Sequence, residues 1–221
     1  QSTFRDAGGL WDKYPVEQVA TPEGYARNPE QVINFYNERR KQLLDVVPNA
    51  GHLGVADLER DFNVTVVTQN VDNLHERAGS THVIHLHGEL TKVCSSRDPY
   101  NPHFVKELAP EEYEVKLGDK AGDGTQLRPF IVWFGESVPE IETAIRYVEQ
   151  ADIFVIIGTS LNVYPAAGLL NYVPRAAEVY LIDPKPVDTH VMRPIHVIQK
   201  GASEGVKELK ALLTVTQPPL P

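Results

Sequence analysis

The densest group of polar side chains directly follows an apolar run and comprises Thr68-Gln69-Asn70-Val71-Asp72-Asn73-Leu74-His75. Amide and carboxylate groups at the carboxyl end of a strand are well placed to bind a polar ligand. The same residue types also form turns by bonding their own backbone, and they cap helices. The chemistry of these residues leaves the two interpretations equally open.

Histidines are the second candidate for chemistry, and they occur in His82-Val83-Ile84-His85-Leu86-His87-Gly88-Glu89. We expect the three imidazoles on one face of an extended segment. One of them can act as a general base near neutral pH. Metal binding is a weaker interpretation because no cluster of cysteines lies nearby. A hydrogen-bonded structural histidine is the third alternative.

A further candidate is Gly158-Thr159-Ser160, between an apolar run and a predicted helix near Pro165. Backbone amides in such a connection can bind a phosphate group, although many similar connections bind nothing. The dinucleotide fingerprint Gly-x-Gly-x-x-Gly is absent from the sequence. Composition and spacing alone therefore identify no dinucleotide.

The elements that must position these side chains alternate along the chain. Apolar runs rich in β-branched residues predict six strands, at 64–68, 82–86, 130–134, 153–157, 178–182 and 196–199. Helical spacing predicts helices at 28–48, 139–150 and 203–213. The alternation predicts an α/β fold with a doubly wound parallel sheet of the Rossmann-like type, and ligands bind such sheets at the carboxyl ends of the strands.

One segment, 92–126, interrupts this alternation because it is rich in Pro, Gly, Asp and Glu. We predict a Rossmann-like domain formed by 1–91 and 127–221, and a small inserted module formed by 92–126. The apolar residues expected to form a core of that module are Tyr100, Phe104, Leu108, Tyr113, Val115 and Leu117.

The composition excludes several classes of protein. A formal net charge of -9 argues against a nucleic-acid partner, which clustered cations would have to bind. The single cysteine, Cys94, can form no internal disulfide. With a single cysteine we expect a cytoplasmic location. No apolar run approaches the roughly twenty residues that cross a bilayer, so we expect no membrane partner.

Taken in order along the chain, these segments resemble the motifs of the sirtuin family of NAD-dependent protein deacylases. The resemblance is carried by Thr3-Phe4-Arg5-Asp6, Gln69-Asn70-Val71-Asp72, His87-Gly88, Phe134-Gly135-Glu136, Gly158-Thr159-Ser160-Leu161 and Gly201-Ala202-Ser203. It implies that NAD is consumed and that acylated lysine side chains of proteins are the partners. The NAD-binding residues that it implies are Phe4, Arg5, Gln69, Asn70, Asp72, Gly158, Thr159, Ser160, Asp183 and Ala202.

The resemblance also implies a mechanism, with His87 as the catalytic base acting beside Asn70. In this family the acyl-lysine oxygen displaces nicotinamide from the ribose, and the products are nicotinamide, lysine and O-acyl-ADP-ribose. His87 takes a proton from a ribose hydroxyl, while Asn70 and Asp72 hold the carboxamide of nicotinamide. Two rivals remain: a sirtuin-like NAD hydrolase or ADP-ribosyltransferase, and a non-catalytic NAD sensor.

The acyl group is the next feature that the resemblance addresses. It assigns Phe134, Gly135 and Glu136 to the acyl-lysine. Tyr36 and Arg39 lie three apart on a predicted helix, so they share a face, and they match the Tyr-x-x-Arg pair of the desuccinylase-like (class III) subgroup. The pair predicts a desuccinylase and demalonylase with some deacetylase activity, because Arg and Tyr can bind a distal carboxylate. The alternative is a solvated helix face with the charged neighbours Glu38, Arg40 and Lys41, and with Tyr36 as a core residue.

The chain departs from the family pattern at two places. Sirtuins usually bind a structural zinc with two Cys-x-x-Cys pairs, whereas here Cys94 stands beside Ser95 and Ser96. We therefore expect no zinc. At Asp183 many relatives carry Asn near the adenosine ribose, and a carboxylate can equally accept from ribose hydroxyls.

Overall fold

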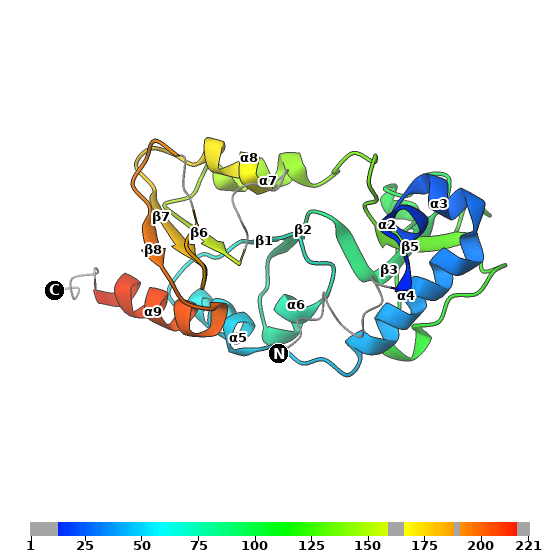
Figure 1. Cartoon of the computed structure of the whole chain (residues 1–221), viewed down its shortest axis with the longest axis horizontal. Helices are drawn as coiled ribbons and strands as arrows, with labels where there is room; N and C mark the ends of the chain where they lie inside the picture. The colour runs from blue at the N-terminus through cyan, green and yellow to red at the C-terminus, as the bar shows by residue number, and fades with distance from the viewer. Residues whose placement is uncertain (1–12, 159–165, 188–190, 216–221) are drawn as a thin grey trace. The chain divides into compact units, whose positions relative to one another are not determined.

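The computed structural model (Figure 1) describes residues 13–158, 166–187 and 191–215 of the chain. Its contacts divide the chain into two compact units. The first consists of 1–47, 68–73 and 85–139, and the second consists of 48–67, 74–84 and 140–221. The chain crosses between the units several times, so neither unit is a single continuous segment. Within the described residues, no helix is both long and apolar enough to span a membrane.

The second unit contains a parallel sheet in the order β6–β7–β8. The strands are β6 (Ile153–Ile157), β7 (Glu178–Ile182) and β8 (His196–Ile198). The helices of the unit are α5 (Ala50–Asp57), α6 (Leu74–Ala78), α7 (Ile141–Val148), α8 (Ala166–Leu169) and α9 (Ala202–Val215), with short 3-10 turns at η2 (Leu58–Arg60) and η5 (Leu170–Tyr172). This parallel sheet confirms the predicted α/β class.

Helix α9 packs closely against strand β7. A Cβ atom on Gly205 of α9 would lie 2.2 Å from Cγ2 of Ile182, so the contact requires a residue without a side chain. Val206 and Leu209, also on α9, are buried in the same apolar cluster as Ile182. The strand and helix predicted at 178–182 and 203–213 therefore form the core of this unit.

The first unit combines helices with an antiparallel sheet in the order β4–β3–β5. Its strands are β3 (Gly88–Ser95), β4 (Lys106–Glu107) and β5 (Leu127–Ile131). Its helices are α2 (Val16–Val19), α3 (Pro22–Arg27) and α4 (Pro29–Leu43), with 3-10 turns at η3 (Pro102–Phe104) and η4 (Pro110–Glu112). Helix α4 begins where the sequence predicts, because the Asn28 side chain accepts a hydrogen bond from the Gln31 amide and Pro29 starts the first turn.

Two short strands, β1 (Val66–Thr68) and β2 (Val83–His85), pair with each other. The amide of Val66 donates to the carbonyl of His82 at 3.0 Å, within the second unit. The amide of Leu86 donates to the carbonyl of Thr68 at 3.0 Å, within the first unit. The loops that follow these strands therefore belong to the first unit.

The prediction of a parallel strand at 130–134 is wrong in both its bounds and the direction of the strand relative to its neighbour. The structure places strand β5 at Leu127–Ile131, antiparallel to β3, with Cys94 opposite Arg128 and Ser95 opposite Leu127. An apolar run does not specify which strand it will pair with, and here the partner is the antiparallel hairpin strand of the insert. The residues after Ile131 are therefore released from the sheet.

Residues 92–126, predicted as a separate module, lie in the first unit together with α2–α4. Asn37 of α4 forms two hydrogen bonds with the backbone of Val115, at 2.8 and 2.9 Å. Arg40 donates to the carbonyl of Tyr113 at 2.9 Å. These bonds fasten the insert to α4 over a sequence separation of more than seventy residues.

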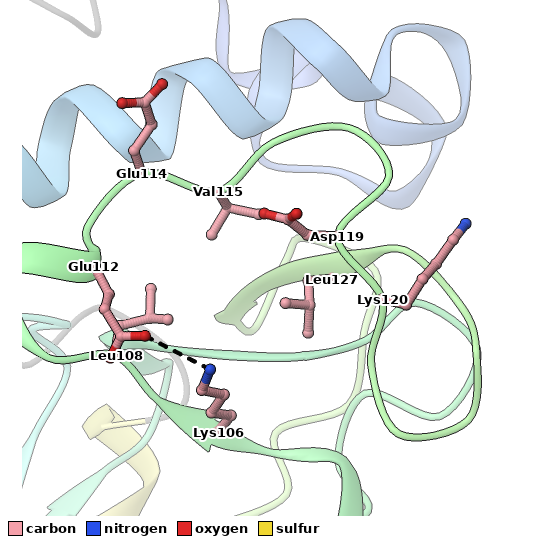
Figure 2. A pocket seen from close by; sticks show the side chains of 8 residues that line it. All are labelled: Lys106, Leu108, Glu112, Glu114, Val115, Asp119, Lys120 and Leu127. Carbon is pink, nitrogen blue, oxygen red and sulfur yellow. Dashed lines mark ion pairs between the residues drawn. The ribbon is translucent and has the colours of Figure 1, made fainter.

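The apolar residues of the insert do not form the independent core that we predicted. Val115 is buried with Ile33 of α4 and Val93 of β3, and Leu108 packs against this cluster. Leu117 is 51% exposed, so its assignment to the core is wrong. Beside the cluster lies a surface hollow of about 440 Å³ (Figure 2), whose walls combine Leu108, Val115 and Leu127 with charged side chains such as the ion-paired Lys106 and Glu112.

Candidate active site

The polar loop after β1 is joined to the histidine segment by hydrogen bonds within the first unit. Besides the bond from Leu86 to Thr68, the amide of Leu90 donates to the carbonyl of Val71 at 2.8 Å. The Asn70 amide donates to Oγ1 of Thr68 at 3.0 Å, which fixes the turn at the start of the loop. Both interpretations of this segment thus have a structural basis: Thr68 caps a turn, and the turn carries Asn70 with an exposed side chain.

The three histidines do not share one face, so that expectation is wrong. His82 bonds to Thr65 at 3.0 Å and packs against Tyr147 in the second unit. His85 is buried in the first unit, where its Nδ1 donates to the carbonyl of Asn70 at 3.0 Å. Residues 82 and 85 differ by an odd number of positions, and successive side chains of a strand point to opposite faces.

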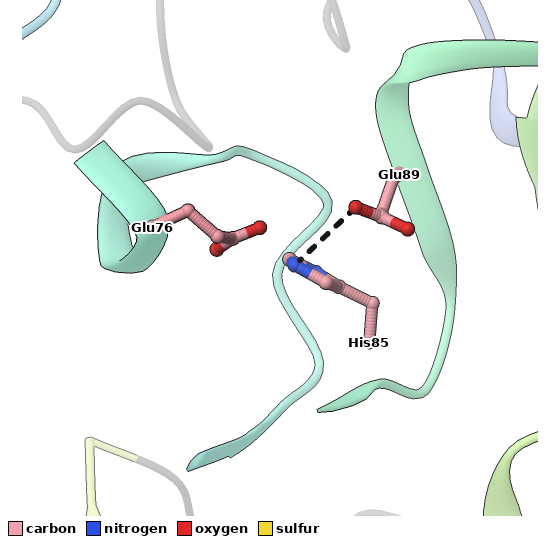
Figure 3. Close-up of side chains that lie close together, drawn as sticks. All are labelled: Glu76, His85 and Glu89. Atoms are coloured by element: carbon pink, nitrogen blue, oxygen red, sulfur yellow. Dashed lines mark ion pairs between the residues drawn. The ribbon is translucent and has the colours of Figure 1, made fainter. Parts of the chain in front are cut away.

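His85 therefore has a structural role within the site. Its Nε2 faces Oε1 of Glu89 at 3.8 Å (Figure 3), while its Nδ1 holds the Asn70 carbonyl. The ring thus links the polar loop to the start of strand β3. His87, the third histidine, is half-buried.

His87 directly precedes strand β3, at the point where Gly88 pairs with Ile131 of β5. Its carbonyl accepts a hydrogen bond from the Val132 amide at 2.9 Å. Gly88, the next residue, has a φ of +87°, and a Cβ atom there would lie 2.1 Å from the Phe130 carbonyl oxygen. Glycine is therefore required directly after His87 for both conformation and space. The close approach places His87 beside the segment that follows β5.

That following segment, residues 132–136, is fixed at several points. The amide of Phe134 donates to the Ala20 carbonyl at 3.0 Å, while the Phe134 side chain is 69% exposed. The carboxylate of Glu136 accepts from the Trp133 amide at 2.8 Å and forms a two-point ion pair with Arg128 at 3.0 and 3.1 Å. An exposed aromatic ring thus projects from a rigidly held turn.

The electrostatics of this turn keep Glu136 ionised. Burial raises the pKa of Glu136, but the hydrogen bonds and charge of Arg128 outweigh burial and leave the pKa below its ordinary value. The Arg128 guanidinium also lies 3.8 Å from the centre of the Trp133 ring, a cation–π contact. Neither Arg128 nor Trp133 was predicted from the sequence. The two partners of Arg128, Trp133 and Glu136, lie five and eight residues further along the chain, and no local sequence pattern indicates such contacts.

Tyr36 and Arg39 are both buried, with exposures of 1% and 8%, so the helix face that carries them is not solvated, although Tyr36 does belong to the core as that alternative expected. The Tyr36 hydroxyl donates to the Val19 carbonyl at 2.9 Å and accepts from Nε1 of Trp133 at 3.0 Å. Burial raises the pKa of Tyr36 to about 12, so the hydroxyl stays protonated. Tyr36 is thereby connected to the turn at 133–136.

The proposed residues of the second unit follow the carboxyl ends of β6 and β7. Gly158 has a φ of +64°, and its amide donates to the Ile182 carbonyl at 3.1 Å. Asp183 follows β7 and accepts from the Lys185 amide at 2.8 Å. Ala202 begins helix α9. The carboxyl ends of parallel strands and the start of a helix suit a nucleotide. Phe4, Arg5, Thr159 and Ser160 lie outside the described residues.

The sequence model of the Sir2 family matches residues 2–165. The chain belongs to the Sir2 family. A protein of Bacteroides thetaiotaomicron named NAD-dependent protein deacylase is 84% identical over 212 residues, which cover 96% of this chain and 91% of that protein. A solved Sir2 homologue in complex with NAD has a TM-score of 0.79 and 36% identity, and covers 97% of this chain and 83% of its own. A mutant Sir2 homologue with bound 2'-O-acetyl ADP ribose has a TM-score of 0.79 and 35% identity, and covers 99% and 88%.

The residues at the place of the usual Sir2 zinc site do not fit a zinc ion. Cys94 is buried, its Sγ donates to the Pro129 carbonyl at 3.8 Å, and burial raises its pKa to about 12. A structural zinc takes a tetrahedral set of thiolate and imidazole ligands, whereas the single thiol here is followed by Ser95 and Ser96 and its Sγ has an oxygen acceptor. No step of the chemistry is therefore assigned to a metal here.

Hydroxyl and carboxylate groups hold this region together instead. Ser95 and Thr125 donate to the two oxygens of Asp123 at 2.5 and 2.7 Å. These hydroxyls, Ser95 first, lower the pKa of Asp123 to about 2. Ser95 is fully buried, and its Oγ also accepts from the amides of Arg97 and Asp98 at 3.0 Å. We call Ser95, Asp123 and Thr125 the hydroxyl–carboxylate cluster.

Proposed function

We propose that the chain removes acidic acyl groups, succinyl or malonyl, from protein lysines in preference to acetyl, and that His87 is its catalytic base. The general activity follows from the comparisons: a Sir2 family member that is 84% identical to a protein named NAD-dependent protein deacylase is an NAD-dependent protein-lysine deacylase. The observation that carries the assignment of residues is the set of backbone hydrogen bonds in the first unit. They join the loop 68–73, His87 and the segment 132–136.

The roles of these residues follow from their chemistry. A half-buried imidazole can take a proton from a ribose hydroxyl when it is neutral. Asn70 and Asp72 offer an amide and a carboxylate to the carboxamide of nicotinamide, and Gln69 offers an amide to the ribose. We assign the exposed Phe134, with Gly135 and Glu136, to the segment that binds the acyl-lysine.

The acidic preference rests on Arg39 more than on Tyr36. A phenol has one proton to donate, and in Tyr36 that proton is directed to the Val19 carbonyl. The hydroxyl oxygen already accepts from Trp133. A guanidinium has five donors and keeps its charge at every physiological pH. We therefore assign the distal carboxylate of the substrate to Arg39, with Tyr36 forming the wall beside it.

The test compares Arg39→Met with the wild-type chain on succinyl-lysine and acetyl-lysine versions of one peptide. Removal of the guanidinium should raise KM for the succinyl peptide at least tenfold, because a charge-assisted hydrogen bond contributes about 1.5–3 kcal/mol. The acetyl peptide should be affected much less. Arg27→Met removes one positive charge from an exposed position at the end of α3 and serves as the control.

Two results would remove the case for acidic selectivity: equal losses on both peptides, or a wild-type enzyme whose kcat/KM favours acetyl. The products are measured by mass spectrometry in the same experiment. O-acyl-ADP-ribose identifies deacylation, whereas free ADP-ribose without loss of the acyl group identifies the rival NAD hydrolase.

We also propose that the insert functions without zinc, with the hydroxyl–carboxylate cluster holding its ends together. Purified protein dialysed against a chelator should contain less than stoichiometric zinc by elemental analysis and keep its thermal midpoint. Ser95→Ala should lower that midpoint, since it removes the hydroxyl that bonds two backbone amides and the Oδ2 atom of Asp123, while Thr125 still bonds the other oxygen of Asp123. A tightly held stoichiometric zinc that stabilises the protein would show this proposal to be wrong.

A further inference from the structure

A tyrosine of the insert contacts the ion pair that holds the segment 132–136. The Tyr100 hydroxyl donates to Oε1 of Glu136 at 2.9 Å. The same oxygen accepts from the Trp133 amide and from Arg128, and the other oxygen accepts from Arg128. With four hydrogen bonds from its own unit, the Glu136 carboxylate is committed to the fold and has little capacity left for a substrate.

From this geometry we propose that Tyr100 is a positioning residue for the acyl-lysine, acting through Glu136 and Trp133. The proposal rests on the assignment of 134–136 as the substrate segment made above. It revises the role of Glu136, whose side chain holds the segment in place. The insert then contributes to substrate binding, although none of its residues was assigned to the site by sequence.

The contacts form a continuous path from the insert to the acyl-binding residues. Glu136 pairs with Arg128, and Arg128 lies against the Trp133 ring, which is 2% exposed. The indole of Trp133 donates to the Tyr36 hydroxyl. A shift of the turn at 133–136 would therefore move both the segment that receives the lysine and the wall of the acyl site.

The protonation states of the two groups agree with a hydrogen bond from the Tyr100 hydroxyl to the Glu136 carboxylate. Burial, and next the charge of Glu136, raise the pKa of Tyr100, so its hydroxyl remains a donor throughout the working pH range. The Tyr100 ring also packs edge-on against Phe130, with ring centres 6.1 Å apart. This ring contact holds the phenol in place when the hydroxyl alone is removed, so Tyr100→Phe is a specific test of the hydrogen bond.

The experiment on Tyr100→Phe measures KM and kcat for an acetyl-lysine peptide, KM for NAD, the thermal midpoint, and hydrogen exchange of residues 131–136. The peptide KM should rise about fivefold, because loss of a bond to a charged group loosens the turn but leaves Arg128 in place. The KM for NAD and kcat should stay close to wild type, and the thermal midpoint should fall by only a few degrees, as expected for the loss of one hydrogen bond. The amides of Trp133 and Phe134 should exchange faster.

Two variants control the result. Tyr113→Phe removes a phenol hydroxyl from another half-buried tyrosine of the insert and should leave the peptide KM unchanged. Phe134→Ala alters the exposed ring of the segment without touching Glu136, and it should raise the peptide KM by itself. The acetyl peptide is used so that the test does not depend on the acidic preference.

The outcomes separate the two proposals. If Phe134→Ala leaves the peptide KM unchanged, the segment does not bind substrate and both proposals about it are wrong. If Phe134→Ala raises that KM but Tyr100→Phe does not, the positioning role alone is overturned. Parallel losses in kcat, both KM values and thermal midpoint for Tyr100→Phe would indicate a merely structural tyrosine and would also overturn it.

Discussion

Replacement of Tyr36 by Phe separates two roles that this buried tyrosine can have beside the proposed acyl site: support of the fold and binding of the substrate. The hydroxyl donates to the Val19 carbonyl at 2.9 Å and accepts from the Trp133 indole at 3.0 Å. Phe leaves both partners in place without a hydrogen bond. Val19 is 0% exposed and Trp133 is 2% exposed, so water has little access to either.

The expected loss of stability can be worked out from these two groups. A buried polar group left without a partner costs about 1–3 kcal/mol. Because the Trp133 indole and the Val19 carbonyl can each relax a little, we expect a combined loss of about 2–4 kcal/mol for Tyr36→Phe. Urea denaturation of wild type and variant, with equal m-values, measures this difference directly.

The expected effect on substrate preference is small by comparison. Since the Tyr36 proton is directed to Val19, the variant should keep most of the ratio of succinyl to acetyl kcat/KM, whereas Arg39→Met should abolish it. The reasoning is refuted if Tyr36→Phe is as stable as wild type and loses the succinyl preference as completely as Arg39→Met. That result would mean that the hydroxyl donates to the substrate and not to Val19.

Three further predictions concern the same unit. His87→Ala should lose deacylation by several orders of magnitude while calorimetry still detects NAD binding; near-normal turnover would contradict its role as base. Glu136→Gln should destabilise the protein by about 3–5 kcal/mol at pH 7, because Arg128 stays buried without its partner. The pKa of Glu136 is lower in the folded protein, so its contribution to the free energy of unfolding is present above the ordinary carboxyl pKa and is lost as the pH falls through the lowered value. The stability of the variant, measured by denaturation at several pH values, should therefore depend less on acid than that of the wild type. Identical pH profiles would argue against the ion pair. Gly88→Ala should reduce the soluble yield or thermal midpoint strongly, because its Cβ would meet the Phe130 carbonyl, and a variant of normal stability would show that β3 and β5 are further apart.

Much of this protein is determined by local sequence. Asn28-Pro29 starts helix α4 because a side-chain cap and a fixed φ act within one turn. The apolar runs at 153–157 and 178–182 become parallel strands, as their composition predicts, although only the second is largely buried and the first is half-buried apart from Ile156. The order of the motifs was sufficient to predict the family, since each motif is a short stretch whose residue types are readable without knowing its neighbours.

The tertiary structure decided the rest, because those features depend on which distant segments meet. The run at 130–134 could not reveal that its strand would end at Ile131, since the pairing partner Gly88 lies more than forty residues earlier. Nor could the spacing of Tyr36 and Arg39 reveal that the Tyr36 hydroxyl is already bonded to Val19 and Trp133. A pattern specifies which side chains are available. Only the packed chain determines which of their donors and acceptors are already used, and therefore which remain to bind a substrate.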